Sequence, residues 1–218
     1  MSRYFFLLIL VVAIFLGCKR QPVIEDNSTI VVQPGRGIAD ICEVGMTLKQ
    51  MQKATRDVTT HGVRDREWFW KRWNVSRHSL IQSLGAIAPI ETDGKIETIC
   101  FHVVKFDSEV TMKGLSITNP FRGKISDKLS FDRGPINRGE VESQFGRVDH
   151  VVTNLWDGVP IAIRGEPFLF QASDGSARIY YRHKGIDFEI ESNIVTSFWI
   201  YAVRKPEAAR GESGSSDL

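Results

Sequence analysis

The sequence is poor in cysteine and has almost no net charge. Its 218 residues include three cysteines, too few for the dense disulfide framework of a small secreted domain. Lysine and arginine number 28 against 26 aspartates and glutamates, so the net charge of +2 gives no signature of nucleic-acid binding. Hydrophobic residues make up 42% of the chain, which is enough for a core and excludes a disordered composition.

The sequence also lacks the spaced motifs of catalysis and metal binding. No two histidines stand at the i, i+4 spacing of a ligand pair, and neither Cys-x-x-Cys nor His-Glu-x-x-His occurs. We therefore expect no enzyme activity, metal, cofactor or small-molecule substrate. A weaker alternative is an enzyme whose site assembles from the scattered residues Asp132, His150 and His183.

The N-terminal hydrophobic stretch is too short to span a bilayer. Residues 4–17 form a run of 14 uncharged residues between Arg3 and Lys19. As a helix this run would reach about 21 Å, less than the roughly 30 Å of a hydrocarbon core. A positive start, a short apolar stretch and a small residue at its end predict a secretory signal peptide over residues 1–17.

The residues that follow resemble a bacterial lipobox. In Phe15-Leu16-Gly17-Cys18, a small residue precedes a cysteine that the lipobox machinery would acylate, with palmitate among the acyl chains, and expose as the new N-terminus. Lys19 is not the aspartate that retains enterobacterial lipoproteins at the inner membrane. The resemblance therefore implies an exported protein anchored in the cell envelope, at the periplasmic face of the outer membrane in a Gram-negative cell. The alternative is an uncleaved single-pass anchor in the inner membrane.

Composition predicts loose segments at both ends of a folded part. Residues 18–36 contain Gln21-Pro22 and Pro34-Gly35 and are expected to form a tether after the lipidated cysteine, with a short strand at 30–32. Residues 205–218 contain no side chains to bury and are expected to be disordered. We expect the folded part to divide into two units, residues 37–108 and residues 109–204.

A helix start occurs twice, ninety positions apart. Thr47 with Gln50, and Asn137 with Glu140, have the spacing of a capping box, and Gly146 is placed to end the second helix. Strand patterns follow each helix, and in 186–190 apolar residues alternate with Asp187 and Glu189, as in a sheet with one solvated face. The sequence therefore predicts an α+β fold of two similar units, each a short helical segment packed on an antiparallel sheet. The expected strands are 80–84, 96–103, 177–181, 186–190 and 194–201.

The helix start Gly45-Met46-Thr47-x-x-Gln50-Met51 resembles that of the BamE/SmpA-like lipoproteins. The second half, with Phe121-Arg122-Gly123-Lys124, Phe145-Gly146 and Phe198-Trp199-Ile200-Tyr201, resembles the same unit, and a tandem arrangement is known in secreted β-lactamase inhibitors. The BamE family serves outer-membrane protein assembly. The resemblance thus implies a binding or structural role in the envelope, beside another envelope protein. It covers scaffold and helix cap and carries no functional motif.

Two residue sets are candidates for a specific role. Cys42 and Cys100, the thiols other than Cys18, would either form a disulfide in an oxidising compartment or stay as buried free thiols. The aromatic segment 68–73 would either supply a core stripe or expose one edge to a protein partner or to lipid. Its candidate partner-binding residues are Trp68, Trp70, Arg72 and Trp73.

Taken together, these patterns predict a lipid-anchored bacterial envelope protein that acts as a non-catalytic binding or structural module. The alternative is an inhibitor of a secreted hydrolase that covers the enzyme with a tandem sheet surface.

Overall fold

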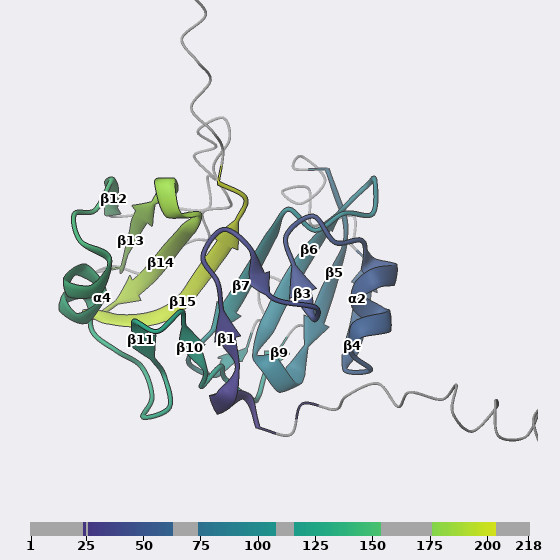
Figure 1. Cartoon of the computed structure of the whole chain (residues 1–218), viewed down its shortest axis with the longest axis horizontal. Helices are drawn as coiled ribbons and strands as arrows, with labels where there is room; N and C mark the ends of the chain where they lie inside the picture. The colour runs from purple at the N-terminus through teal and green to yellow at the C-terminus, as the bar shows by residue number, and fades with distance from the viewer. Residues whose placement is uncertain (1–23, 25, 63–73, 108–115, 154–175, 204–218) are drawn as a thin grey trace, which may run out of the picture.

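The computed structural model describes residues 24, 26–62, 74–107, 116–153 and 176–203 (Figure 1). Its centre is one antiparallel sheet of eight strands. In chain order these are β4 (Val58–Gly62), β5 (Val75–Ile81), β6 (Ala86–Glu91), β7 (Thr98–His102), β12 (His150–Thr153), β13 (Ser176–Tyr181), β14 (Ile186–Glu191) and β15 (Ile194–Tyr201). Across the sheet the order is β12-β13-β14-β15-β7-β6-β5-β4.

Short elements surround this sheet. Two α-helices are described, α2 (Leu48–Ala54) and α4 (Arg138–Phe145), with the 3₁₀ turns η1 (Asn27–Thr29), η2 (Gln82–Leu84) and η3 (Arg182–Lys184). The small strands are β1 (Val31–Val32), β2 (Gly37–Ile38), β3 (Cys42–Glu43), β8 (Phe106–Asp107), β9 (Ser116–Ile117), β10 (Lys124–Ile125) and β11 (Leu129–Ser130). They form a β1-β10-β11 sheet and the pairs β2-β3 and β8-β9.

The prediction of two units, each a helix on its own sheet, is wrong. Residues 37–108 contribute β4 to β7 and residues 109–204 contribute β12 to β15, but these strands belong to one sheet. The two parts join where Thr98–His102 of β7 pairs with Ser197–Tyr201 of β15. The described structure is mainly β. The order helix, two strands, 3₁₀ turn, two strands does occur in each part, but a local pattern cannot show which strand edges will pair.

Both predicted capping boxes are confirmed. Before α2, the Thr47 hydroxyl accepts the Gln50 N–H and the Gln50 side chain accepts the Thr47 N–H. Before α4, Asn137 and Glu140 make the same reciprocal bonds. Gly146 ends α4 with φ +80°, a backbone conformation that glycine adopts without a Cβ penalty.

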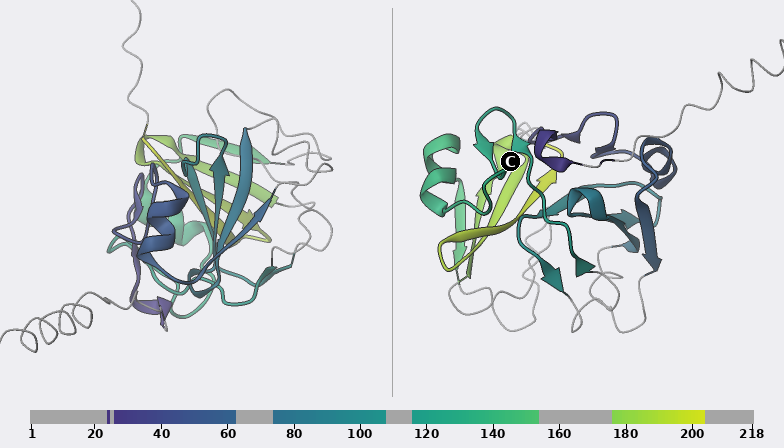
Figure 2. Two further views of the ribbon diagram at one scale, coloured as in Figure 1. Left: turned by 90° about the vertical axis from the view of Figure 1, so that its right-hand side faces the viewer. Right: turned by 90° about the horizontal axis from the view of Figure 1, so that it is seen from below.

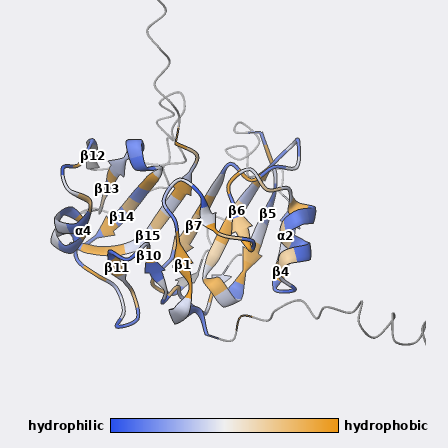
Figure 3. Cartoon of the chain, viewed as in Figure 1, coloured by the Kyte–Doolittle hydropathy of each residue, from blue (hydrophilic) through white to orange (hydrophobic). Residues whose placement is uncertain are grey.

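The core lies between the sheet and the layer of helices and hairpins on one side of it (Figure 2). Alternate strand residues point into this layer, where Met51 of α2 and Val141 of α4 are fully buried. At the junction of the two parts, Phe101 stacks on Phe198 at 4.9 Å between ring centroids, and Phe121 meets both rings edge-on. The central strands are accordingly rich in hydrophobic residues, whereas helices α2 and α4 also carry hydrophilic ones (Figure 3).

The predicted tether is too long. Asn27 is buried: its Nδ2 donates to the carbonyls of Ser83 and Pro120, and its Oδ1 accepts the Arg122 N–H at 2.8 Å. Val32 is fully buried in the short strand β1, which pairs with β10. Residues 27–36 therefore belong to the packed structure, because a buried amide and a strand pair compensate for the proline and glycine of this segment.

Strand predictions fared better. The patterns at 177–181, 186–190 and 194–201 coincide with β13, β14 and β15, and 96–103 contains β7. The strand expected at 80–84 is wrong for its last three residues, which form η2 after the end of β5. In the part of the chain that the structure describes, no helix is long and apolar enough to cross a membrane.

Candidate functional site

The sheet face that turns away from the helices carries a cluster of buried polar side chains. Strand alternation directs Arg178, Asp187 and Ser197 to this face, because the residues between them belong to the apolar core on the other side. All three are fully buried. The sequence pattern placed Asp187 on a solvated face, and the structure corrects this.

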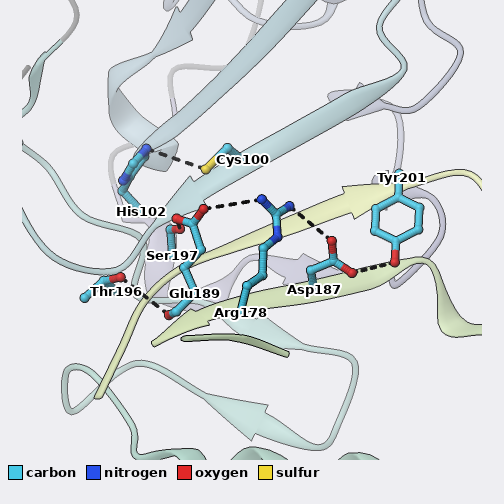
Figure 4. A network of polar contacts seen from close by, with 8 residues as sticks. All are labelled: Cys100, His102, Arg178, Asp187, Glu189, Thr196, Ser197 and Tyr201. Atoms are coloured by element: carbon cyan, nitrogen blue, oxygen red, sulfur yellow. Dashed lines mark hydrogen bonds and ion pairs between the residues drawn. The ribbon is translucent and has the colours of Figure 1, made fainter. Parts of the chain in front are cut away.

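Arg178 lies at the centre of this polar cluster (Figure 4). Its Nη2 donates to Asp187 Oδ2 at 3.1 Å, and its Nη1 donates to Glu189 Oε1 at 3.4 Å. The Tyr201 hydroxyl donates to Asp187 Oδ1 at 2.5 Å, and the Ser197 hydroxyl donates to Glu189 Oε2. One buried cation is therefore held between two carboxylates, each of which also accepts a hydrogen bond from a hydroxyl group.

Burial sets the protonation of this network. It raises the pKa of Asp187 to about 6, although Arg178 and the Tyr201 hydroxyl favour the carboxylate form. Burial likewise raises the pKa of Tyr201 far above its usual value. The phenol therefore stays protonated and donates a hydrogen bond to Asp187. At neutral pH the network is an ion pair, and mild acid protonates Asp187.

A cysteine and a histidine lie next to this network. Cys100 Sγ is 3.5 Å from His102 Nε2 on β7. Burial raises the pKa of Cys100 well above its usual range and lowers the pKa of His102 to about 4. Both side chains are therefore uncharged at neutral pH, whereas a nucleophilic cysteine needs the thiolate.

The other part of the sheet shows that the fold does not require this charge network. Each 3₁₀ turn ends in a left-handed glycine, Gly85 after η2 and Gly185 after η3. Counted from these glycines, Arg178, Asp187 and Glu189 correspond to three uncharged positions of β5 and β6. Those positions are occupied by His78, Ile87 and Pro89. Burial, together with the smaller effect of His61, lowers the pKa of His78 to about 4.

A second polar site lies on the surface at the carboxyl end of α4. An open hollow of about 530 Å³ is lined by Phe145, Arg147, Val148, Asp149 and His183, and we call it the basic hollow. Asp149 Oδ2 lies 2.7 Å from His183 Nδ1 and also accepts the backbone N–H of His183 at 3.4 Å. Burial opposes ionisation of Asp149, but the bonds from His183 outweigh it and lower its pKa.

Two lysines stand over the same helix end. Lys184 Nζ donates to the Phe145 carbonyl at 2.7 Å, and Lys128 Nζ donates to the Gln144 carbonyl at 3.4 Å. Their ammonium groups lie 5.5 and 5.8 Å from the centroid of the Phe145 ring. They complement the partial negative charge of the helix end and bring two further cations to the basic hollow.

The structure resolves the alternative left open for the two thiols. Cys42 and Cys100 are both free and buried, so the candidate disulfide is not formed. Cys42 belongs to the core on the helix side, where its Sγ is 3.6 Å from Met51 Sδ. Cys100 points to the opposite face of the sheet, which keeps the two sulfur atoms apart.

The scattered enzyme site is not assembled. His183 pairs with Asp149 in the basic hollow, whereas Asp132 lines a different hollow of about 440 Å³ beside the start of α4. His150 begins β12, opposite Tyr180. In the residues covered by the structure, no group of three or more His, Cys, Asp or Glu side chains is placed to hold a metal ion.

The other predicted site residues lie outside the described residues. These are the lipidation site Cys18 and the aromatic segment with Trp68, Trp70, Arg72 and Trp73. Their roles stay predictions. Conversely, sequence reasoning missed Arg178, Glu189 and Tyr201 as site residues. The available signal was the single charged residue of β13, Arg178, beside the acidic residues of β14.

No protein-family model, curated protein or solved structure matches this chain. The resemblance to the BamE/SmpA-like lipoproteins therefore also stays a prediction.

Proposed function

We propose that the chain is a lipoprotein of the bacterial envelope, acylated at Cys18, which acts as a non-catalytic binding module near a membrane surface. The lipobox-like residues 15–18 support the anchor. Between Cys18 and Asn27, which is buried, only eight residues intervene. Even fully extended, they would keep the folded part within about 30 Å of the acyl chains.

The observation that carries the non-catalytic role is the chemical state of the buried polar face. The thiol of Cys100 and the imidazole of His102 are both uncharged, and the carboxylates of Asp187 and Glu189 are occupied by Arg178 and by hydroxyl groups. These groups hold strands together and are poorly placed to transfer protons to a substrate. A partner would therefore meet exposed side chains, and those around α4 are among them.

Metabolic labelling with an alkyne fatty acid tests the anchor. We expect label on the wild-type chain, none on Cys18→Ser, and normal labelling of the matched variant Cys42→Ser. Mass spectrometry should find an acylated Cys18 at the N-terminus, and fractionation should place the chain with the envelope membranes. An intact Met1, or an unacylated terminus in the cytosolic fraction, would contradict the proposal.

A further inference from the structure

The two 3₁₀ turns of the sheet have the same backbone geometry but opposite surface character. In η2, Gln82 and Ser83 are held by other segments: Gln82 Nε2 donates to the Ser116 carbonyl and the Ser83 carbonyl accepts the Asn27 amide. In η3 the corresponding residues are Arg182 and His183, both exposed, followed by Lys184. The turn itself therefore does not require basic residues.

The aspartate beside each turn has a structural explanation. Asp57 Oδ2 accepts the Ser83 N–H at 2.5 Å, and Asp149 Oδ2 accepts the His183 N–H at 3.4 Å. Both aspartates stand directly before a strand, β4 or β12, and cap the turn in the same way. What distinguishes the second turn is the set of cations around it.

We infer that the basic hollow is a docking site for an acidic segment of a partner protein. Arg147 and His183 line it, and Lys128 and Lys184 lie over the Phe145 ring that forms part of its wall. Against these four basic residues the lining contributes one carboxylate, Asp149, which already pairs with His183. The surplus of positive charge is complementary to glutamate and aspartate side chains. This inference deepens the proposed function by naming the chemistry of the partner.

The shape of the site favours a polypeptide over a bilayer. The cations surround a hollow, which can accept a protruding peptide segment. A flat layer of lipid headgroups would contact only the rim of the hollow and not its lining. The lining also mixes a cation with a carboxylate and an aromatic ring. A peptide can offer a carboxylate to Arg147, a backbone N–H to Asp149 and apolar atoms to Phe145, whereas a phosphate group has neither an N–H donor for Asp149 nor apolar atoms for Phe145.

Titration with a synthetic peptide tests the inference. The full chain in neutral detergent is titrated with a fluorescent ten-residue Glu/Asp peptide and with its Gln/Asn counterpart. We expect binding of the acidic peptide alone, weakening as salt rises, and at least tenfold weaker in Arg147→Gln/Lys128→Gln. The matched variant Lys49→Gln/Arg133→Gln removes the same charge from exposed sites elsewhere and should change the affinity less than twofold.

Three outcomes would overturn the docking site: equal losses in the two double variants, no binding of the acidic peptide, or binding only of anionic-lipid vesicles or inorganic phosphate added as competitors. Thermal melting compares Arg147→Gln/Lys128→Gln with wild type to show that the fold is intact, and Arg147→Gln alone, at an exposed position, is titrated in the same way. Because the titration does not depend on acylation, its failure would leave the Cys18 labelling result unchanged, and the reverse also holds.

Discussion

Arg178 is the residue on which the buried polar face depends. We predict that Arg178→Met lowers the free energy of unfolding by about 3–5 kcal/mol, because Asp187 and Glu189 would stay buried without their cation. Urea denaturation followed by tryptophan fluorescence measures this. The double variant Arg178→Met/Asp187→Leu removes one of the stranded charges and should recover part of the loss. An unchanged midpoint in Arg178→Met would show that the ion pair contributes nothing.

Buried histidines should make the protein acid-sensitive. Burial lowers the pKa of His102 to about 4, so the unfolded chain binds its proton more readily between pH 6.5 and 4. His102 therefore stabilises the fold fully above pH 6.5, and this contribution, of the order of 3 kcal/mol, is lost as the pH falls to 4. Asp187 acts in the opposite sense, because its pKa is raised to about 6 and its contribution disappears as the pH rises through that value.

Unfolding free energies between pH 4 and 7.5 test these signs. His102→Leu should flatten the decline toward acid pH, and Asp187→Asn should steepen it. A wild-type stability that is constant over this range, together with variants of the same slope, would contradict both assignments.

At the scale of elements, the capping boxes fix where the two helices begin. We predict that Asn137→Ala lowers stability by about 1 kcal/mol, because the Glu140 N–H loses its acceptor at 3.0 Å. Asn137→Asp keeps an acceptor and should stay close to wild type. Gln144→Ala, an exposed change within the same helix, controls for helix propensity. Equal midpoints for the Ala and Asp variants at position 137 would rule out the cap as the cause.

At the scale of the whole molecule, each part of the chain locks the other. The Gly35 N–H donates to the carbonyl of Gly185 at 3.1 Å, and the backbone of Phe121 lies against Gly85. Gly35 thus contacts the glycine that ends η3 in the second part of the sheet, and Phe121 contacts the glycine that ends η2 in the first part. We infer that the described residues unfold as one cooperative unit.

Gly185→Ala tests this interlock. A Cβ at Gly185 would clash with the carbonyl oxygen of Tyr201 and would lie 2.6 Å from the Gly35 Cα, whereas at Gly94, which also has positive φ, it would meet nothing within 4 Å. Gly94→Ala should cost about 1 kcal/mol for the backbone conformation alone, and Gly185→Ala clearly more. Circular dichroism and fluorescence should report a single shared transition. Equal losses, or two separate transitions, would contradict the interlock.

Local signals in the sequence predicted local structure well. Thr47 with Gln50 and Asn137 with Glu140 marked both helix starts, because a capping box depends on residues only three positions apart. Strands β13 to β15 followed from period-two alternation for the same reason. The basic hollow was not foreseen, because Arg147 and His183 are far apart in sequence and meet only when β12 pairs with β13.

The sequence by itself thus determined both helix caps and the positions of strands β13 to β15, since each depends on neighbouring residues. Only the tertiary structure decided that β7 pairs with β15, which joins both parts in one sheet. It also decided that Asp187 is buried beside Arg178 and that Cys100 and Cys42 are not bridged. The physical reason is that strand alternation assigns a side chain to one of two faces, whereas the pairing of distant strands decides what covers each face.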